Sequence, residues 1–322
     1  MRRTHFLQTS LTSLLLIAVG LVALAQADAG YRGITFSPDG SCLLAVYSDG
    51  KWSFIYKIPI DTGKATRLTA ATSGYEGLPS YSADGKQIAY SFSPGPGTNS
   101  RIFIANPDGS NAHPLANSGT SDFGALLSPD SKSVIFKRYG YYGKYSPIAR
   151  PAQHEWNFYT ADLNGDNMRR LTSESLYEVS PASLSPDGKS LVFVDSFEAI
   201  VIHPLEEMSK PNAVLKPRLN GKKAEVYGEA VFSADGKSIL FTAAFNKGGK
   251  YDYNVYQLDL RTQNVESLTS AKGHAGQLQI SRDGQKAVFL HEDYDRTDGK
   301  ATVFLLDLKT HDLTPLTING IH

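Results

Sequence analysis

The sequence has almost no cysteine. Cys42 is the only one in 322 residues, so no internal disulfide can form. Neither sign of charge is in excess, with 32 basic and 32 acidic residues, which argues against a protein that follows nucleic-acid phosphates. Beyond residue 25, no stretch approaches the roughly 20 apolar residues of a transmembrane helix. We therefore expect a chain held together by its core, without a nucleic-acid partner or a membrane span in its mature part.

Familiar catalytic motifs are missing as well. The sequence contains no G-x-S-x-G, no H-E-x-x-H, no phosphate-binding loop and no C-x-x-C. A lone serine nucleophile would leave no such signature, so the absence favours a non-enzymatic role without deciding it. No cofactor is expected from the motifs.

The first 29 residues have the pattern of a secretory signal peptide. Arg2 and Arg3 precede an uncharged, mostly apolar run over residues 11–25, and small residues follow at the spacing that signal peptidases require. Cleavage after Ala27 or after Ala29 fits equally well, and the alternative is a retained membrane anchor. Export without disulfides indicates a bacterial envelope protein that is periplasmic or secreted.

The composition favours strands and turns. Seventeen Tyr and fifteen Phe accompany 28 Gly and 16 Pro, and aromatic residues are enriched in strands while Gly and Pro punctuate turns. The expected fold class is all β.

One motif, Ser-x-Asp-Gly flanked by apolar residues, recurs six times. A type I turn closed by a left-handed glycine suits it, as in Ser185 to Gly188. In the third copy Ser131 replaces the glycine, at a cost of roughly 1 kcal/mol if it keeps the left-handed conformation. The six serines are Ser37, Ser82, Ser128, Ser185, Ser233 and Ser281.

The spacing of the motif predicts the architecture. Successive serines lie 45, 46, 57, 48 and 48 residues apart, and a period in the forties with strand-like content is typical of propeller blades of four antiparallel strands. We therefore expect residues 30–322 to form a single six-bladed β-propeller. Its ring would close by packing of blade one against blade six or through a strand shared with residues 318–322.

The repeated Ser-x-Asp-Gly-Lys, followed by an apolar strand and by Leu-Thr near the end of each unit, resembles the WD40-like (PD40) repeats of TolB-like β-propellers. The resemblance covers essentially all of the mature chain. It implies a periplasmic propeller, and it carries little information about activity because many propellers share the repeat.

In such a blade the repeated turns share one face of the disc, and the variable loops share the other. The longest variable loop, residues 138–155, is rich in tyrosine, which suits a partner-binding or sugar-binding surface. An equally weighted alternative is that its aromatic side chains fold over the rim of the propeller. The candidate partner-binding residues are Tyr139, Tyr141, Tyr142, Tyr145, His154 and Trp156.

A second candidate site is the mouth of the central channel. Residues four to seven positions before each repeated serine enter the innermost strand, and one charged or titratable residue stands there in each blade. If they converge, they could bind a divalent cation, an amine or a basic peptide. The alternative is ordinary solvated loop acids. These residues are Arg32, Glu76, Asp122, Glu178, Glu229 and His274.

Three functions follow as hypotheses. The first is a monomeric scaffold that binds a protein or peptide in the cell envelope. The second is a metal-assisted lyase or lactonase, because His154, His274 and His291 fall on variable loops and resemble a metal site of polysaccharide-lyase propellers. The third is a carbohydrate-binding module that uses Trp156 and the tyrosines.

Overall fold

A computed structural model describes residues 29–115, 119–143, 152–172, 176, 179–196, 198–206, 212–245, 253–296, 298 and 300–321. This part of the chain contains strands and turns and no helix, which confirms the all-β prediction. No helix in it is long enough and apolar enough to cross a membrane. The predicted signal peptide lies outside the described residues.

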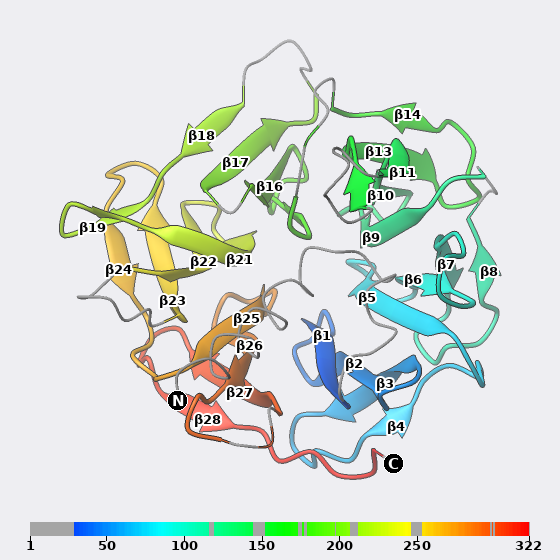
Figure 1. Ribbon diagram of the computed structural model, residues 1–322, viewed down its shortest axis with the longest axis horizontal. Coiled ribbons are helices and arrows are strands. Elements are labelled where there is room, and N and C mark those ends of the chain that lie inside the picture. The colour runs from blue at the N-terminus through cyan, green and yellow to red at the C-terminus, as the bar shows by residue number, and fades with distance from the viewer. Residues whose placement is uncertain are drawn as a thin grey trace, which may run out of the picture.

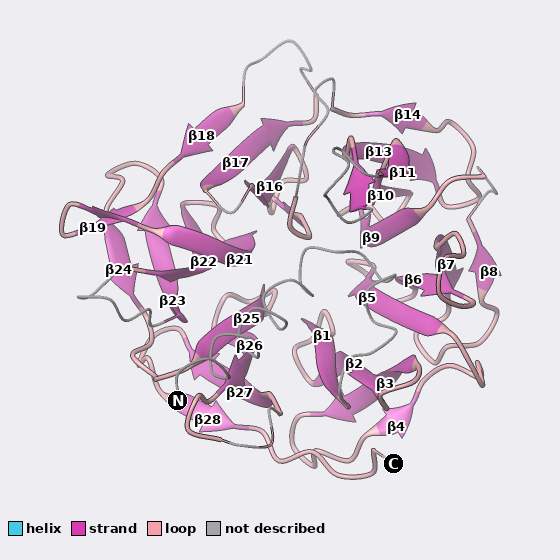
Figure 2. Cartoon of the chain, in the orientation of Figure 1, coloured by secondary structure: helices cyan, strands magenta, loops and turns pink. Residues whose placement is uncertain are grey.

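The strands form antiparallel meanders arranged around a common centre (Figures 1 and 2). In each meander the first strand lies nearest the centre and the last lies at the rim. Two pairs of neighbouring meanders merge into eight-stranded sheets, because a parallel contact joins Ser53 to Tyr75 and another joins Tyr253 to His274. Two short hairpins stand apart from the meanders.

The strands follow in chain order. The first two meanders are β1 (Gly30–Phe36), β2 (Cys42–Ser48), β3 (Ser53–Pro59), β4 (Thr66–Arg67), then β5 (Tyr75–Tyr81), β6 (Ile88–Ser93), β7 (Arg101–Ala105) and β8 (His113–Pro114). The third is β9 (Asp122–Leu127), β10 (Ser133–Arg138), β13 (Asn157–Asp162) and β14 (Arg169–Arg170), interrupted by the hairpin β11 (Tyr141–Gly143) and β12 (Ala152–His154).

The second half of the chain repeats this plan. The fourth meander is β15 (Ser183–Leu184), β16 (Ser190–Asp195), β17 (Ala199–Pro204) and β18 (Ala213–Leu215), and the hairpin β19 (Arg218–Leu219) and β20 (Lys222–Lys223) follows it. The last two are β21 (Glu225–Phe232), β22 (Ser238–Ala244), β23 (Tyr253–Asp259), β24 (Val265–Ser267), then β25 (His274–Ile280), β26 (Lys286–Glu292), β27 (Thr302–Asp307) and β28 (Leu313–Pro315).

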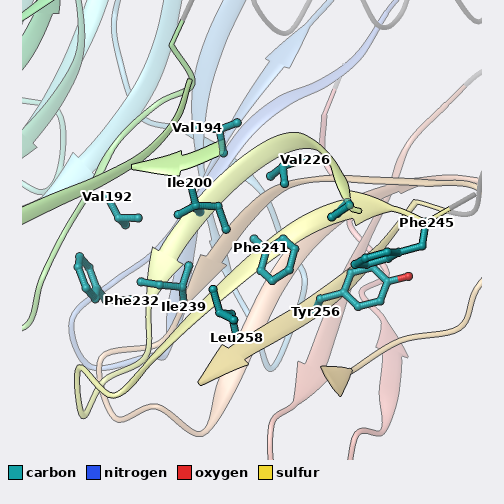
Figure 3. Packing of buried hydrophobic residues seen from close by; sticks show 13 residues of the cluster. Val192, Val194, Ile200, Val226, Phe232, Ile239, Phe241, Phe245, Tyr256 and Leu258 are labelled. Atoms are coloured by element: carbon teal, nitrogen blue, oxygen red, sulfur yellow. The ribbon is translucent and has the colours of Figure 1, made fainter. Parts of the chain in front are cut away.

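The core lies between neighbouring meanders, because their middle strands are apolar on both faces. Figure 3 shows one such cluster, in which Val192 and Ile200 of the fourth meander face Val226, Ile239 and Phe241 of the fifth. All five side chains are fully buried. The interface between neighbouring meanders therefore buries the two middle strands, which are the apolar strands of the repeat.

Every repeated turn has the same hydrogen bonds, as the Ser185 copy illustrates. The Ser185 hydroxyl donates to Asp187 Oδ1 at 2.6 Å and accepts the N–H of Ser190 at 2.9 Å. The N–H of Gly188 donates to the Ser185 carbonyl at 2.8 Å. Gly188 has a φ of 71°, and a Cβ there would lie 2.8 Å from Pro129 Cγ in the preceding turn. The glycine is thus required both by its backbone and by the neighbouring turn.

The C-terminal tail contacts the turn between β3 and β4 of the first meander. The N–H of Ala65 donates to the Asn319 carbonyl at 2.8 Å, and the N–H of Asn319 donates to the Gly63 carbonyl at 3.0 Å. One apolar cluster combines residues of β1 to β3 with Val288, Leu290 and Val303 of the last meander and with Ile318 from the tail. The first and last meanders therefore pack against each other, and the tail contacts the first meander through an isolated bridge between Lys64 and Asn319, not through a shared strand.

Ser131 adopts the left-handed conformation expected for the glycine that it replaces, with φ at 57°. We predict that Ser131→Gly raises the free energy of unfolding by about 1 kcal/mol, because glycine removes the Cβ strain at this φ. Ser131→Ala keeps the Cβ and should bring no such gain. Urea denaturation of the three proteins measures the difference, and equal stabilisation by both substitutions would contradict it.

Candidate functional site

Glu76 connects two meanders. Its side chain is 1% exposed, and Oε2 accepts the N–H of Ile55 at 2.9 Å and the hydroxyl of Thr69 at 2.6 Å. Burial raises the pKa of this carboxyl, and the two hydrogen bonds oppose the rise. The carboxylate therefore closes the end of the preceding meander instead of facing a ligand.

Side chains at the equivalent strand ends of other meanders make similar hydrogen bonds, which shows that the role of Glu76 is structural. In the third meander the Thr172 hydroxyl accepts the N–H of Phe158 and donates to Asn157, both at 3.0 Å. In the fifth meander Thr269 makes the same pair of bonds, at 3.0 Å with Val255 and 2.9 Å with Asn254. Glu76 supplies the acceptor that Asn157 and Asn254 provide elsewhere. The Leu-Thr signature of the repeat thus marks a strand-end hydrogen bond.

Asp122 is engaged by an arginine from the adjacent strand. Arg138 is its direct cross-strand partner, and Arg138 Nε donates to Oδ1 at 2.6 Å while Nη2 donates to Oδ2 at 3.0 Å. The two side chains are 7% and 12% exposed. A bidentate, largely buried pair fixes both groups, so Asp122 presents little charge to the centre of the ring.

Glu229 is the predicted residue with the most unusual surroundings. It is 2% exposed, Oε2 accepts the N–H of Leu278 at 3.3 Å, and Oε1 has no hydrogen-bond partner in the described part of the chain. Burial raises the pKa of this carboxyl, while the hydrogen bonds and the more distant Lys137 oppose the rise. A buried carboxyl with one free oxygen is costly unless it is protonated or meets a ligand.

Lys137 is a functional candidate that sequence reasoning missed. Its ammonium is buried in the middle of the ring, donates to the Val179 carbonyl at 3.0 Å and lies 4.8 Å from the centre of the Trp156 ring. One signal was available: the other copies of the repeat carry Val46, Ser91, Val194, Thr242 and Leu290 at this position.

His274 and His291 lie close together in the last meander. Nε2 of each ring is buried and has no hydrogen-bond partner within the described ranges. Burial, reinforced by the neighbouring His291, lowers the pKa of His274 to about 4, and burial also lowers the pKa of His291. Both rings are therefore neutral at pH 7, with a nitrogen lone pair available on at least one of them.

The remaining channel-mouth candidates add little. Arg32 lies on β1, where its charge lowers the pKa of the half-buried Glu292, a smaller effect than the rise that burial causes. Glu178 lies outside the described residues. Among the described residues, no group of three or more His, Cys, Asp or Glu side chains is placed to hold a metal ion.

The channel-mouth candidates all come from the same window of the repeat, but their side chains do not point in the same direction. The window spans four positions, and neighbouring positions in a strand point to opposite faces. The innermost strands also contain bulges, between Gly77 and Ser80 in β5 and between Gly276 and Gln279 in β25. Glu76 and Asp122 stand at the same distance before the bulge of their strand. Glu229 and His274 stand at other positions relative to the bulges of theirs.

The tyrosine-rich loop contains a hairpin that the sequence did not predict. β11 pairs with β12, with Tyr141 opposite His154 and Tyr142 opposite Gln153. Of Tyr141, Tyr142 and His154 the structure describes the backbone, and Tyr145 lies outside the described residues. The hairpin follows the end of β10 that is remote from the Ser128 turn, so it stands on the face of the variable loops.

Trp156 and Tyr139 anchor this loop. Trp156 is 2% exposed and packs edge-on against Phe123 and Tyr139, with ring centres 5.8 and 5.6 Å apart. The prediction of Trp156 as a partner-binding residue is therefore wrong, because its indole belongs to the core. Tyr139 is half-buried and stacks on Phe123, as the alternative of aromatic side chains folded over the rim describes.

The raised pKa of Glu229 gives a prediction with a definite sign. The folded state favours the protonated acid, so as the pH rises from the ordinary pKa of 4.5 through the folded-state pKa, Glu229 lowers the stability of the protein. Glu229→Gln cannot ionise. Its unfolding free energy relative to wild type should rise between about pH 4 and pH 7. A curve for Glu229→Gln that stays parallel to that of wild type would refute the assignment.

Comparison with known proteins agrees with the arrangement of β-meanders around a common centre. No family model matches the chain. The Tol-Pal system protein TolB of Francisella tularensis subsp. tularensis is 27% identical over 206 residues, which are 62% of this chain and 43% of that protein. The chain thus matches less than half the length of this relative.

Solved structures give the same picture. A structure assigned as TolB from Agrobacterium tumefaciens has a TM-score of 0.61 at 18% identity and covers 81% of this chain and 86% of its own. An oligogalacturonate lyase in complex with manganese has a TM-score of 0.59 at 15% identity and covers 88% of this chain and 77% of its own. These likenesses concern the fold, and together with the curated relative they confirm the resemblance of the repeats to those of TolB-like β-propellers.

Proposed function

We propose that this protein is an exported scaffold that binds a protein or peptide partner in the bacterial cell envelope. The observation that carries the proposal is the sequence similarity to TolB, a protein named for the Tol-Pal system. The signal-peptide pattern of residues 1–29 and the single cysteine support a periplasmic or secreted location.

We also propose that the meanders are the six four-stranded blades of a closed ring, and that the protein is a monomer. The six repeated turns, the apolar cluster shared by the first and last meanders and the bonds of the tail to residues 63–65 support closure. A closed ring has no long open sheet edge that would invite association with a second copy.

The β11–β12 hairpin is the surface best suited to the partner. It interrupts the third meander on the variable face, and the rigid core contacts of Tyr139 and Trp156 hold its base. A loop of this kind can carry Tyr141, Tyr142 and Tyr145 to a partner at low entropic cost.

A metal-assisted enzyme that acts on a sugar or lactone is the alternative. Two observations favour it: the buried Nε2 atoms of His274 and His291, and the fold shared with a manganese-bound oligogalacturonate lyase. Tight stoichiometric binding of Mn²⁺ that is lost in His274→Ala would support this alternative over the scaffold. The carbohydrate-binding hypothesis is weakened, because Trp156 is buried.

Export makes a direct prediction about the N-terminus. Protein recovered from the periplasmic fraction should begin at Asp28 or at Gly30, because signal peptidase cuts after small residues such as Ala27 and Ala29. N-terminal sequencing and the intact mass measure this. An unprocessed chain that begins at Met1 would argue for the retained anchor.

Partner binding is tested by crosslinking in the envelope. A photoreactive phenylalanine derivative at Tyr142 should give one discrete covalent adduct with another envelope protein, because the hairpin lies in the proposed interface. The same group at Asp235, in a repeated turn on the opposite face, is the matched control and should give none. Equal labelling from both positions, or none from Tyr142, would contradict the proposal.

A further inference from the structure

The connection between the fourth and fifth meanders contains a second hairpin, made of β19 and β20. Asn220 and Gly221 form its tip with φ values of 51° and 77°, as in a type I′ turn. The N–H of Ala224 donates to the Pro217 carbonyl at 2.9 Å and closes the base. This is therefore a built hairpin, with a defined tip and base.

The hairpin is fixed to the body of the protein. Ala224 is fully buried, and Leu219 packs from β19 against the cluster shown in Figure 3. In Figure 1 it stands at the rim beside β24. Because the hairpin is attached to the core, its exposed face keeps a fixed position on the protein.

The exposed face of the hairpin is basic. Residues 216–223 contain no acid and four cations, all of them exposed: Lys216, Arg218, Lys222 and Lys223. Arg218 stands directly opposite Lys223 in the ladder, an arrangement of like charges that destabilises a strand pair. Lys223 Nζ forms an ion pair with Glu198 Oε2 at 3.3 Å. Arg218 also donates to the Gly221 carbonyl at 3.0 Å. These contacts offset part of the repulsion, and the charge of residues 216–223 stays strongly positive, which favours an external anion.

An apolar group stands beside these cations. Val214 on the edge strand β18 is 56% exposed, and Tyr294 is the other large apolar side chain exposed to this degree in the described ranges. The patch thus combines a convex basic turn with one exposed aliphatic side chain.

We propose that the basic hairpin, residues 214–223, docks the protein on an anionic membrane surface through lipid phosphate headgroups. The eight residues 216–223 are far fewer than the roughly 20–30 residues that each partner contributes to a stable protein interface. Attraction to a charged bilayer needs no enclosing pocket, because each cation near the surface contributes separately. This docking goes beyond the proposed scaffold function and does not depend on it.

The test uses the mature protein and vesicles of phosphatidylglycerol mixed with phosphatidylcholine. Wild type should bind these vesicles at low ionic strength, bind less as salt is added, and ignore vesicles of phosphatidylcholine alone. Lys216→Gln with Arg218→Gln should weaken the partition coefficient roughly 30-fold, since each cation is worth about fivefold. Glu198→Gln should strengthen it roughly fivefold by releasing Lys223.

Matched controls make the result specific to the hairpin. Lys132→Gln with Lys309→Gln changes the net charge equally at distant exposed sites and should alter binding by less than about twofold. The proposal fails if wild type does not distinguish the two vesicles, or if the two double variants behave alike. It also fails if soluble polyglutamate, and not the vesicles, binds with the dependence on Arg218, because the target is then an acidic protein. Crosslinking from Tyr142 is unaffected by any of these outcomes.

Discussion

The hydrogen bond from a serine hydroxyl to the aspartate two residues later is the contact on which this ring depends. It measures 2.6 to 2.7 Å in all six turns. In each turn it lowers the pKa of an exposed aspartate, so its contribution is present at neutral pH and lost as the pH falls through the lowered pKa. Because each turn sets the register of the first two strands, the face that every apolar side chain occupies follows from it.

The same repetition explains why charged residues near the centre are structural. Each meander must be tied to the next across a buried interface, and backbone groups at the strand ends need partners there. Glu76 and Lys137 satisfy that need with contacts to the Ile55 N–H and the Val179 carbonyl. Asp122 is paired with Arg138 inside its own meander. Glu229 departs from this pattern, since one of its oxygens is left without a partner in the described residues.

The sequence predicted the repeat, the turns and the all-β fold, because these depend on local chemistry repeated at a fixed period. Ser131 even keeps the left-handed conformation of the glycine that it replaces. The channel-mouth residues were harder, because a bulge of one residue reverses the direction of a side chain and leaves no mark in the sequence. Trp156 was misjudged for a different reason. The sequence around an aromatic residue at the end of a loop looks the same whether its side chain anchors the loop in the core or faces a partner.

The repeat also locates the parts of the chain that are free to carry function. Both hairpins outside the meanders, β11–β12 and β19–β20, are additions that the ring does not need for its core. Each is anchored by apolar side chains, Trp156 for the first and Leu219 for the second, and the second presents exposed basic residues. Removal of Arg2 and Arg3 with the predicted signal peptide leaves the mature chain slightly acidic. Attraction to an anionic partner must therefore come from local departures from the average charge. In the described residues the basic run of Lys216 to Lys223 is one of them.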